Sequence, residues 1–489
     1  MEFQMKSVVQ GKTFLSTAVL LILTAFLCSM QNAVTFLGGE PLTDASVFRY
    51  MGSVILGGGM PYRDSFDHKG PVVYLLDALG MKLSYWKGIW VISFLLLLVA
   101  VIFFYKTARL AAGKKSALLA TISSMLMYSA VYQQGGEMVE DYALPFLAIA
   151  GYIFTDYYLN QRISFIRLII CGFTFGVVLL IRPNIAGLWV IMCLGVLVQC
   201  IRNREFQSLG KYLLGFIAGT LAVVIPVFQW LYMGNAFDDF IKDYLIFNSS
   251  YTADSSSYYG KLETLARFTL NSVVLLCICY LAFQIKIKKR VIDLVWLLTL
   301  CLNLIFISIS GKYFLHYGIT LVPSFIYPLA LINEQGVQAD AVNYRPFFAA
   351  VWTALFIPLL VQSAMQIRTQ ISHTGLSEDT DKVVQMVKQS THVSDPITVF
   401  GNDDLIYIAS ERQSASRYSY QSPIGMIDPS IMDSYFEELE MNVPNVVVVS
   451  SESSLRKDDY ERMYLFLNVH SYEKAGESGD LSVYVLGKQ

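Results

Sequence analysis

The sequence predicts a polytopic α-helical membrane protein with a small α/β domain at its C-terminal end. Three observations indicate this fold class. Hydrophobic residues make up 55% of the 489 residues and charged residues only 15%, which is more apolar surface than a soluble core of this length could bury. Apolar windows of roughly 17 to 25 residues recur along most of the chain. From residue 373 onward, short segments with the patterns of strands and helices alternate instead.

The apolar windows predict about eleven transmembrane helices. The first window follows Lys6 and Lys12. It is too long for a signal peptide and lacks a small-residue cleavage site, so we expect it to remain as a span. The predicted spans are residues 13–37, 88–106, 116–133, 142–159, 164–181, 184–201, 210–233, 265–285, 291–309, 316–333 and 346–366.

Positive charges between the spans predict their orientation. Lysines and arginines gather in alternate loops, near residues 106–115, 162–167, 202–211 and 286–290. Such loops stay on the cytoplasmic side. We therefore expect a multi-pass protein of the cell membrane with a cytoplasmic N-terminus and an extracytoplasmic C-terminal region. The loops expected outside are residues 38–87, 134–141, 234–264 and 310–315.

The first outer loop, residues 38–87, carries its own helical patterns. Apolar residues recur at helical spacing after Asp44, and Pro71 begins a second apolar stretch that runs to residue 83. Both segments resemble amphipathic helices that lie in the outer membrane interface. The sequence GGGMPYRD between them is typical of a turn.

The C-terminal region predicts an extracytoplasmic α/β domain. We expect a transmembrane domain over residues 1–372 and this second domain over 373–489, because strand and helix patterns alternate there. The predicted strands are 397–402, 443–450 and 481–486, and the predicted helices are 380–389, 429–441 and 460–468.

Charge and cysteine content exclude some classes of function. The net charge is −2 and the isoelectric point is about 6.2, so the chain has no basic field that would favour nucleic acid as a partner. The seven cysteines lie in apolar segments or at their edges, and none follows residue 370. A disulfide framework is therefore not expected.

Ionisable residues gather at the outer ends of the predicted spans. Charged groups at this depth are costly unless they face water, one another or a ligand. A charged lipid headgroup is such a ligand, because basic side chains bind its phosphate while carboxylates act as a base or bind a metal. The residues are Asp44, Asp64, Asp67, His68, Lys69, Glu137, Glu140, Asp141, Arg182, Lys312, Tyr313 and His316.

The first outer loop also resembles a known family. The run DASVFRYMGSVILGGGMPYRDSFDHKGPVVYLLDALG, residues 44–80, is similar to the first loop of the GT-C membrane glycosyltransferases, and among them to the protein mannosyltransferase and aminoarabinose transferase branch (family 39-like). The shared pattern is an acidic residue directly after the first span, a tyrosine a few residues on, and then PY.D..DHKGP. The expected spans, the acidic pair at 140–141 and Arg182-Pro183 agree with this resemblance.

The resemblance implies transfer of a sugar from a polyprenyl phosphate, such as undecaprenyl phosphate, to an acceptor on the outer face. It implies that Asp44 is the general base in a displacement that inverts the anomeric centre. The donor phosphate would be bound by Lys69, His68 and Arg182, a metal or the acceptor by Glu140 and Asp141, and the other candidates are Asp67, Tyr62, Tyr313 and His316. Many relatives have an Asp-Glu pair where this chain has Asp44-Ala45, so a divalent metal, Mg²⁺ or Mn²⁺, stays open.

Structural roles are alternatives for each of these residues. Asp44 could only cap a helix, and His68 with Lys69 could extend toward the membrane interface. Asp64 and Asp67 are common turn residues.

The same holds for the candidates further along the chain. Glu140 and Asp141 suit the N-terminus of the fourth span. Arg182 could belong to a turn between helices, and His316 could be structural.

A transporter or flippase of a lipid-linked sugar is the alternative function. Transporters commonly carry repeats and place their sites near the bilayer midplane, whereas this sequence shows no repeat and gathers its charges at one face. An enzyme is therefore favoured. Its acceptor could be a glycan, a lipid or a protein, and the first loop favours a bacterial cell-wall polysaccharide or teichoic acid.

Overall fold

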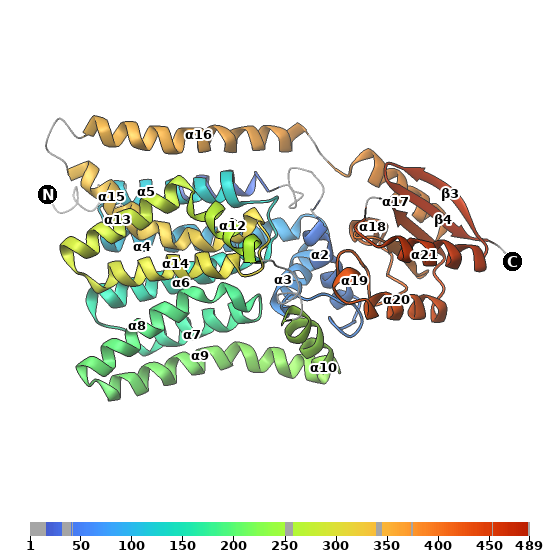
Figure 1. Cartoon of the computed structure of the whole chain (residues 1–489), viewed down its shortest axis with the longest axis horizontal. Coiled ribbons are helices and arrows are strands. Elements are labelled where there is room, and N and C mark those ends of the chain that lie inside the picture. The colour runs from blue at the N-terminus through green and yellow to red at the C-terminus, as the bar shows by residue number, and fades with distance from the viewer. Residues whose placement is uncertain are drawn as a thin grey trace, which may run out of the picture. The chain divides into compact units, whose positions relative to one another are not determined.

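The computed structural model describes residues 16–31, 41, 43–249, 258–338, 345–372, 375–451 and 453–487. The chain divides into two compact units, each formed by three separate stretches of sequence (Figure 1). Unit 1 comprises Met1–Gln31, Trp90–Val227 and Ser255–Ser372, and unit 2 comprises Asn32–Ile89, Phe228–Asp254 and His373–Gln489. The first predicted outer loop and the C-terminal region therefore belong to the same unit.

Helices build the described part of unit 1. They are Ser16–Cys28, α4 (Gly88–Ala111), α5 (Lys114–Met127) with the π-helix η1 (Tyr128–Tyr132), α6 (Val139–Asn160), α7 (Phe165–Leu179), the 3₁₀ turn η2 (Pro183–Ile185), α8 (Gly187–Asn203), α9 (Phe206–Met233), α12 (Tyr258–Thr269), α13 (Ser272–Lys288), α14 (Val291–Ser308), the 3₁₀ helix η4 (Leu315–Leu321), α15 (Val322–Gln338) and α16 (Arg345–Ser372).

Each predicted span contains a helix, but the predicted number of membrane crossings is not confirmed. Among the described residues, α4, α9, α14 and the stretch Leu315–Gly336 are long and apolar enough to cross a membrane. The pair α12 and α13 adds a fifth candidate only if it is counted as one broken span. In the first predicted span, residues 32–37 lie outside the described residues.

The predicted span 265–285 is not a single straight helix. The helices α12 and α13 meet at an angle of 78°. The side chain of Asn271 accepts a hydrogen bond of 3.0 Å from the backbone N–H of Val273 and so caps the start of α13. Hydropathy did not reveal the break because apolar residues continue on both sides of this one asparagine.

Glycines allow α7 and α9 to meet at backbone distance. A Cβ atom on Gly172 of α7 would lie 1.9 Å from the carbonyl oxygen of Phe216, and one on Gly219 of α9 would lie 1.9 Å from that of Ile169. Small residues at helix contacts are typical of helices that pack within a membrane.

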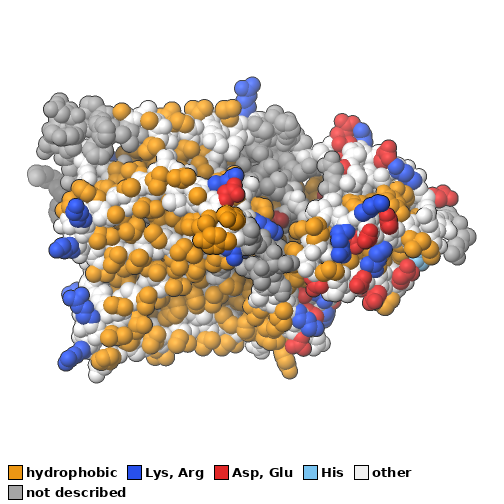
Figure 2. Space-filling model, in the orientation of Figure 1, with side chains coloured by type: hydrophobic (Ala, Val, Ile, Leu, Met, Phe, Trp, Pro, Cys, Tyr) orange, Lys and Arg blue, Asp and Glu red, His pale blue; other side chains and the backbone are white. Residues whose placement is uncertain are grey.

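The surface of unit 1 agrees with a membrane environment. Hydrophobic side chains cover the face of its helices seen in Figure 2, and Lys and Arg side chains gather at one end of them. The loops that join α8 to α9 and α13 to α14 lie at that same end (Figure 1). Both loops belong to the set that the sequence predicts to be cytoplasmic.

Unit 2 contains a four-stranded sheet in the order β1-β2-β4-β3. Strands β1 (Ile397–Phe400) and β2 (Val446–Ser450) are parallel, and β4 (Leu481–Leu486) is antiparallel to β2 and to β3 (Tyr472–Ser478). The three predicted strands are present. Strand β3 was missed because it is an edge strand with a polar, largely exposed sequence, YEKAGES.

Helices accompany the sheet and fill the other stretches of unit 2. They are α2 (Thr43–Leu56), α3 (Pro71–Leu83), α10 (Phe237–Phe240) with the π-helix η3 (Ile241–Ile246), α17 (Glu378–Ser390), α18 (Leu405–Ser410), α19 (Ile424–Ile427), α20 (Ser430–Met441) and α21 (Lys457–Val469).

The first-loop helices α2 and α3 pack tightly against each other. A Cβ atom on Gly52 of α2 would lie 2.9 Å from the backbone nitrogen of Ala78 in α3. Most residues of α2 are buried, so this helix does not show the single apolar face that its spacing predicted. Packing against α18 explains part of this burial, because the Tyr50 and Tyr407 ring centroids lie 4.9 Å apart.

Polar and aromatic contacts join all three stretches of unit 2. The backbone N–H of Phe66 donates to the carbonyl oxygen of Arg417 at 2.7 Å, and Arg417 forms an ion pair with Asp243 of η3. The ring of Phe66 meets those of Phe247 and Tyr418 at centroid distances of 5.4 Å. The loop between α2 and α3 is therefore held by both of the other stretches.

Candidate functional site

The loop between α2 and α3, residues 57–70, has a fixed conformation. Tyr62 has a φ of 70°, and its backbone N–H donates to the carbonyl oxygen of Ser65 at 2.8 Å. Asp64 Oδ2 accepts from the backbone N–H of Met60 at 2.7 Å and pairs with Arg63 at 2.6 Å. Asp64 is therefore engaged as a turn residue, which is the structural alternative that the sequence suggested.

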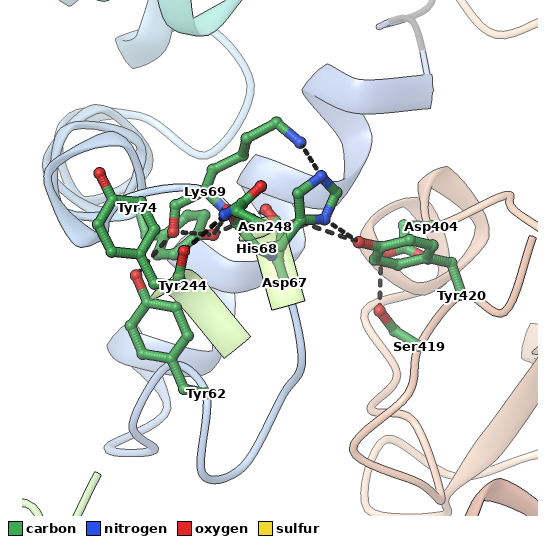
Figure 3. Close-up of polar contacts among 10 residues, drawn as sticks. All are labelled: Tyr62, Asp67, His68, Lys69, Tyr74, Tyr244, Asn248, Asp404, Ser419 and Tyr420. Carbon is green, nitrogen blue, oxygen red and sulfur yellow. Dashed lines mark hydrogen bonds and ion pairs between the residues drawn. The ribbon is translucent and has the colours of Figure 1, made fainter. Parts of the chain in front are cut away.

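Three consecutive residues, Asp67, His68 and Lys69, form a polar chain at the end of this loop (Figure 3). Asp67 Oδ1 lies 3.3 Å from His68 Nδ1, and Lys69 Nζ lies 2.6 Å from His68 Nε2. The lysine ammonium can only donate, so His68 Nε2 is the acceptor and Nδ1 carries the proton toward Asp67. The imidazole thus connects a buried carboxylate to a partly exposed ammonium group.

Two buried phenols and an amide support the backbone of this chain. The Tyr62 hydroxyl donates to the carbonyl oxygen of Lys69 at 2.8 Å, and the Tyr74 hydroxyl donates to Asp67 Oδ2 at 2.7 Å. Asn248 Nδ2 donates to the carbonyl oxygen of His68 at 2.6 Å. The backbone on either side of the His68 ring is thus held by hydrogen bonds.

The C-terminal region supplies a further partner for Asp67. The hydroxyl of Tyr420 donates to Asp67 Oδ1 at 2.9 Å and lies 3.4 Å from His68 Nδ1. The neighbouring Ser419 donates to Asp404 Oδ2 at 2.7 Å, and Asp404 is fully buried. Figure 3 shows Tyr420 pointing from its own segment toward the Asp67–His68 pair.

The two buried carboxyl groups have opposite pKa shifts. Burial alone would raise the pKa of Asp67, but the charge of Lys69, the neighbouring His68 ring and the two tyrosine hydroxyls outweigh it, so this pKa lies below its usual range. Burial raises the pKa of Asp404 to about 8, and the nearby charge of Asp67 adds to the shift. At neutral pH Asp67 is therefore ionised, while Asp404 is largely protonated.

Asp44 lies in the first turn of α2, and its side chain is exposed. Its charge acts on Tyr420: burial raises the pKa of this phenol well above its usual range, and the carboxylates of Asp67, Asp404 and Asp44 add to the shift. The Asp44 carboxylate is therefore near enough to Tyr420 to affect its pKa, and it is exposed to solvent and so accessible to a bound molecule.

A second polar cluster lies within unit 1. Arg182 Nη1 donates to Glu140 Oε1 at 2.7 Å, and the guanidinium group lies 4.5 Å from the centroid of the Tyr317 ring. Asp141 accepts from the Tyr128 hydroxyl at 2.8 Å and from the backbone N–H of Met138 at 3.1 Å. Arg182 and Glu140 are thus brought together, as their predicted positions at span ends allowed.

His316 and Tyr313, near the ninth and tenth predicted spans, have different neighbours. His316 Nδ1 lies 2.7 Å from Gln134 Oε1. Tyr313 packs against Phe268, with ring centroids 4.8 Å apart, and lies under the guanidinium group of Arg267 at 5.1 Å.

Glu140 and Asp141 do not fit a divalent metal site. One oxygen of Glu140 is taken by Arg182, and both oxygens of Asp141 accept hydrogen bonds. Within the described ranges, no group of three or more His, Cys, Asp or Glu side chains could hold a metal ion. Glu140 Oε2 is buried and has no hydrogen-bond partner there, which leaves one acceptor atom for a polar ligand.

The sequence pattern anticipated only part of the site in unit 2. The motif drew attention to Tyr62, Asp67, His68 and Lys69, and the structure brings these four together. It missed Tyr74, Asn248, Tyr420 and Asp404. Tyr74 lies in an apolar run that is typical of a helix, and the other three lie far along the chain in segments whose patterns do not point to this site.

The fold resembles that of solved structures of ArnT and AglB. ArnT from Cupriavidus metallidurans in the apo state is 13% identical, with 99% of this chain and 100% of that chain covered and a TM-score of 0.62. The ArnT structure bound to undecaprenyl phosphate is 14% identical, with 98% and 99% covered and a TM-score of 0.63. The oligosaccharyltransferase AglB from Archaeoglobus fulgidus, in complex with an inhibitory peptide and a dolichol-phosphate, is 13% identical, with 90% and 70% covered and a TM-score of 0.53.

These likenesses confirm the GT-C fold, whereas the branch within it stays a prediction. No curated protein matches the sequence. The family model of the competence-induced protein Ccs4 N-terminal domain matches residues 7–341. This match covers more than half of the 489 residues, and the chain therefore belongs to the competence-induced Ccs4 family.

Proposed function

We propose that this chain is a membrane glycosyltransferase that moves a sugar from a polyprenyl-phosphate donor to an acceptor on the outer face of the membrane. The observation that carries the proposal is the Asp67–His68–Lys69 chain, in a loop that resembles the donor loop of GT-C enzymes. It presents a partly exposed ammonium group that is backed by a buried carboxylate. The shared fold with ArnT and AglB supports the proposal.

Lys69 is the proposed ligand of the donor phosphate. An ammonium group forms charge-assisted hydrogen bonds to phosphate oxygens, and its interaction with phosphate strengthens as negative charge grows on the leaving group. His68 Nε2 accepts one hydrogen bond from Lys69 Nζ at 2.6 Å. The other N–H bonds of the Lys69 ammonium group are proposed to bind the phosphate. Arg182 stays a proposed second phosphate ligand, although its guanidinium group is already engaged by Glu140.

Asp44 is the proposed general base. The acceptor hydroxyl attacks the anomeric carbon, the bond between that carbon and the phosphate oxygen breaks, and the hydroxyl proton passes to the Asp44 carboxylate. The polyprenyl phosphate leaves with the bonding electron pair, so the anomeric centre is inverted. The exposed position of Asp44 suits a base that must meet an acceptor arriving from water.

The acceptor is proposed to be a bacterial cell-envelope glycan, such as a wall polysaccharide or teichoic acid. In this proposal the N-terminus is cytoplasmic and unit 2 faces the outside. The free oxygen of Glu140 is a candidate contact for a polar ligand such as an acceptor hydroxyl.

The test is transfer by the purified protein in detergent. Polyprenyl-phosphate sugars with different headgroups are offered with envelope glycan fractions, and both donor loss and labelled glycan are measured. We expect donor to be consumed without any membrane compartment. Movement of the lipid across sealed vesicles, with no donor consumed in detergent, would instead support the flippase.

The Lys69→Ala variant serves as the reference with weakened donor use, compared with the parent at a donor concentration below the parental KM. Arg63→Ala is its matched control, because it removes a cation from the same loop that pairs with Asp64 at 2.6 Å. Equal donor consumption by the parent and by Lys69→Ala would contradict the donor role of this loop.

A further inference from the structure

Tyr420 is the residue of the C-terminal α/β region that contacts Asp67 in the loop between α2 and α3, residues 57–70, here called the donor loop. Its ring is buried, and its hydroxyl donates to Asp67 Oδ1 at 2.9 Å and lies 3.4 Å from His68 Nδ1. Asp67 Oδ1 is the same oxygen that faces the imidazole at 3.3 Å. The phenol is therefore placed to fix the carboxylate against the histidine that holds Lys69.

We propose that Tyr420 is a positioning residue for donor binding, acting on Lys69 through Asp67 and His68. This inference rests on the function proposed above. Tyr420 itself does not touch the phosphate. Its hydroxyl keeps Asp67 oriented, Asp67 fixes the proton of His68 on Nδ1, and His68 Nε2 then holds the ammonium group where the phosphate binds.

Several observations separate this role from simple packing. Asp67 Oδ2 accepts from Tyr74, and Asp67 Oδ1 accepts from Tyr420 and from the backbone N–H of His68 at 2.7 Å. A buried carboxylate between two phenols has one preferred orientation, because rotation would leave an oxygen without its donor. A carboxylate that accepts a hydrogen bond from an imidazole also determines which ring nitrogen carries the proton.

The arrangement predicts a pH effect with a definite sign. Hydrogen bonds to the charged form lower the pKa of a carboxyl group, and Tyr420 contributes to the low pKa of Asp67. Loss of this hydroxyl raises the pKa of Asp67, so the carboxylate is lost at a higher pH. The titratable groups that face Asp67 are Lys69, His68, Tyr74, Tyr420, Tyr62, Asp243 and Asp404.

The experiment compares Tyr420→Phe with Tyr435→Phe in the full-length protein. Tyr435 is an equally buried phenol whose hydroxyl contacts Thr398 at 2.9 Å, within the α/β region. The donor KM, acceptor KM and kcat are measured between pH 3 and 8 with a polyprenyl-phosphate sugar, so that the range includes the acid limb set by Asp67. We expect Tyr420→Phe to raise the donor KM on the order of tenfold, with a small change in kcat, and to move the acid limb of donor affinity to higher pH.

Two further measurements distinguish the positioning role of Tyr420 from misfolding of the variant. In an Asp67→Asn background, loss of the Tyr420 hydroxyl should have no further effect on donor KM, because the two residues act in series. Replacement of Tyr420 by 3-fluorotyrosine keeps the phenol but makes it more acidic, so the acid limb should move to lower pH.

The outcomes are distinguishable. A parent protein that consumes no polyprenyl-phosphate sugar overturns the proposed function itself. An active parent whose Tyr420→Phe variant keeps the parental donor KM and pH profile overturns only the positioning role. A Tyr435→Phe variant with the same changes as Tyr420→Phe would also overturn it, because any buried phenol of the region would then serve.

Discussion

Replacement of Asp44 by asparagine separates its two possible roles. Asparagine keeps the size of the side chain and caps helices about as well as aspartate, but it cannot accept the proton of the acceptor. The side chain is exposed in the first turn of α2, so the free energy of unfolding should change by less than about 0.5 kcal/mol. The fold and donor binding should therefore be retained.

The expected loss of rate is much larger than this change in stability. General-base catalysis contributes about 10² to 10⁴ in rate, which corresponds to about 2.7 to 5.4 kcal/mol of activation free energy at 1.36 kcal/mol per tenfold. A stability change of at most about 0.5 kcal/mol at an exposed position cannot mimic such a loss.

The assay measures sugar transfer at matched protein levels and saturating donor, together with donor affinity and melting temperature in detergent. Asp64→Asn is the matched control, because Asp64 is an exposed aspartate in the loop that follows α2 but pairs with Arg63 at 2.6 Å, and it should lose little activity. Transfer by Asp44→Asn at the parental rate would refute the reasoning and leave Asp44 as a helix cap.

Three further outcomes are expected. Lys69→Ala should raise the donor KM on the order of 10- to 100-fold, the value of a hydrogen bond to a charged group, and leave the acceptor KM near that of the parent; equal effects on both KM values would contradict the phosphate role. Burial raises the folded-state pKa of Asp404 from an ordinary 3.8 to about 8. Its contribution to stability is therefore fully present below pH 4 and is lost as the pH rises toward 8, at up to about 1.4 kcal/mol per pH unit. Asp404→Asn should flatten the fall in melting temperature between pH 5 and pH 8, and parallel curves for variant and parent would refute this. Gly52→Ala should lower stability by about 1–3 kcal/mol, because the new Cβ atom lies 2.9 Å from the backbone nitrogen of Ala78; Gly210→Ala, where no atom lies within 4 Å, should leave the melting temperature unchanged or slightly raised.

Hydropathy predicted the positions of the helices in unit 1 better than their shapes. An apolar window senses average composition over about 20 residues, so it locates α4 or α14 but misses the 78° bend at Asn271. Strand prediction succeeded for β1, β2 and β4, which are rich in β-branched residues.

The candidate site was predictable where its residues are adjacent in sequence. Asp67, His68 and Lys69 stand together, so a motif could indicate them. Tyr420 is separated from Asp67 by 353 positions, and neither a motif nor periodicity in its own segment marks it. Its contribution comes from tertiary packing alone, which a local pattern does not encode.

The composition of unit 2 also sets the order in which the molecule can be completed. The donor loop is synthesised near the start of the chain, whereas the tyrosine that completes the Asp67 contact follows 353 residues later. At a synthesis rate of about 5–20 residues per second, the interval is roughly 20–70 seconds. A nascent chain therefore carries this loop well before it can assemble that contact, and a protein that lacks its last 70 residues, Tyr420 included, could not form it. The carboxylate of Asp67 therefore acquires its full set of hydrogen-bond donors only after the C-terminal region has been synthesised.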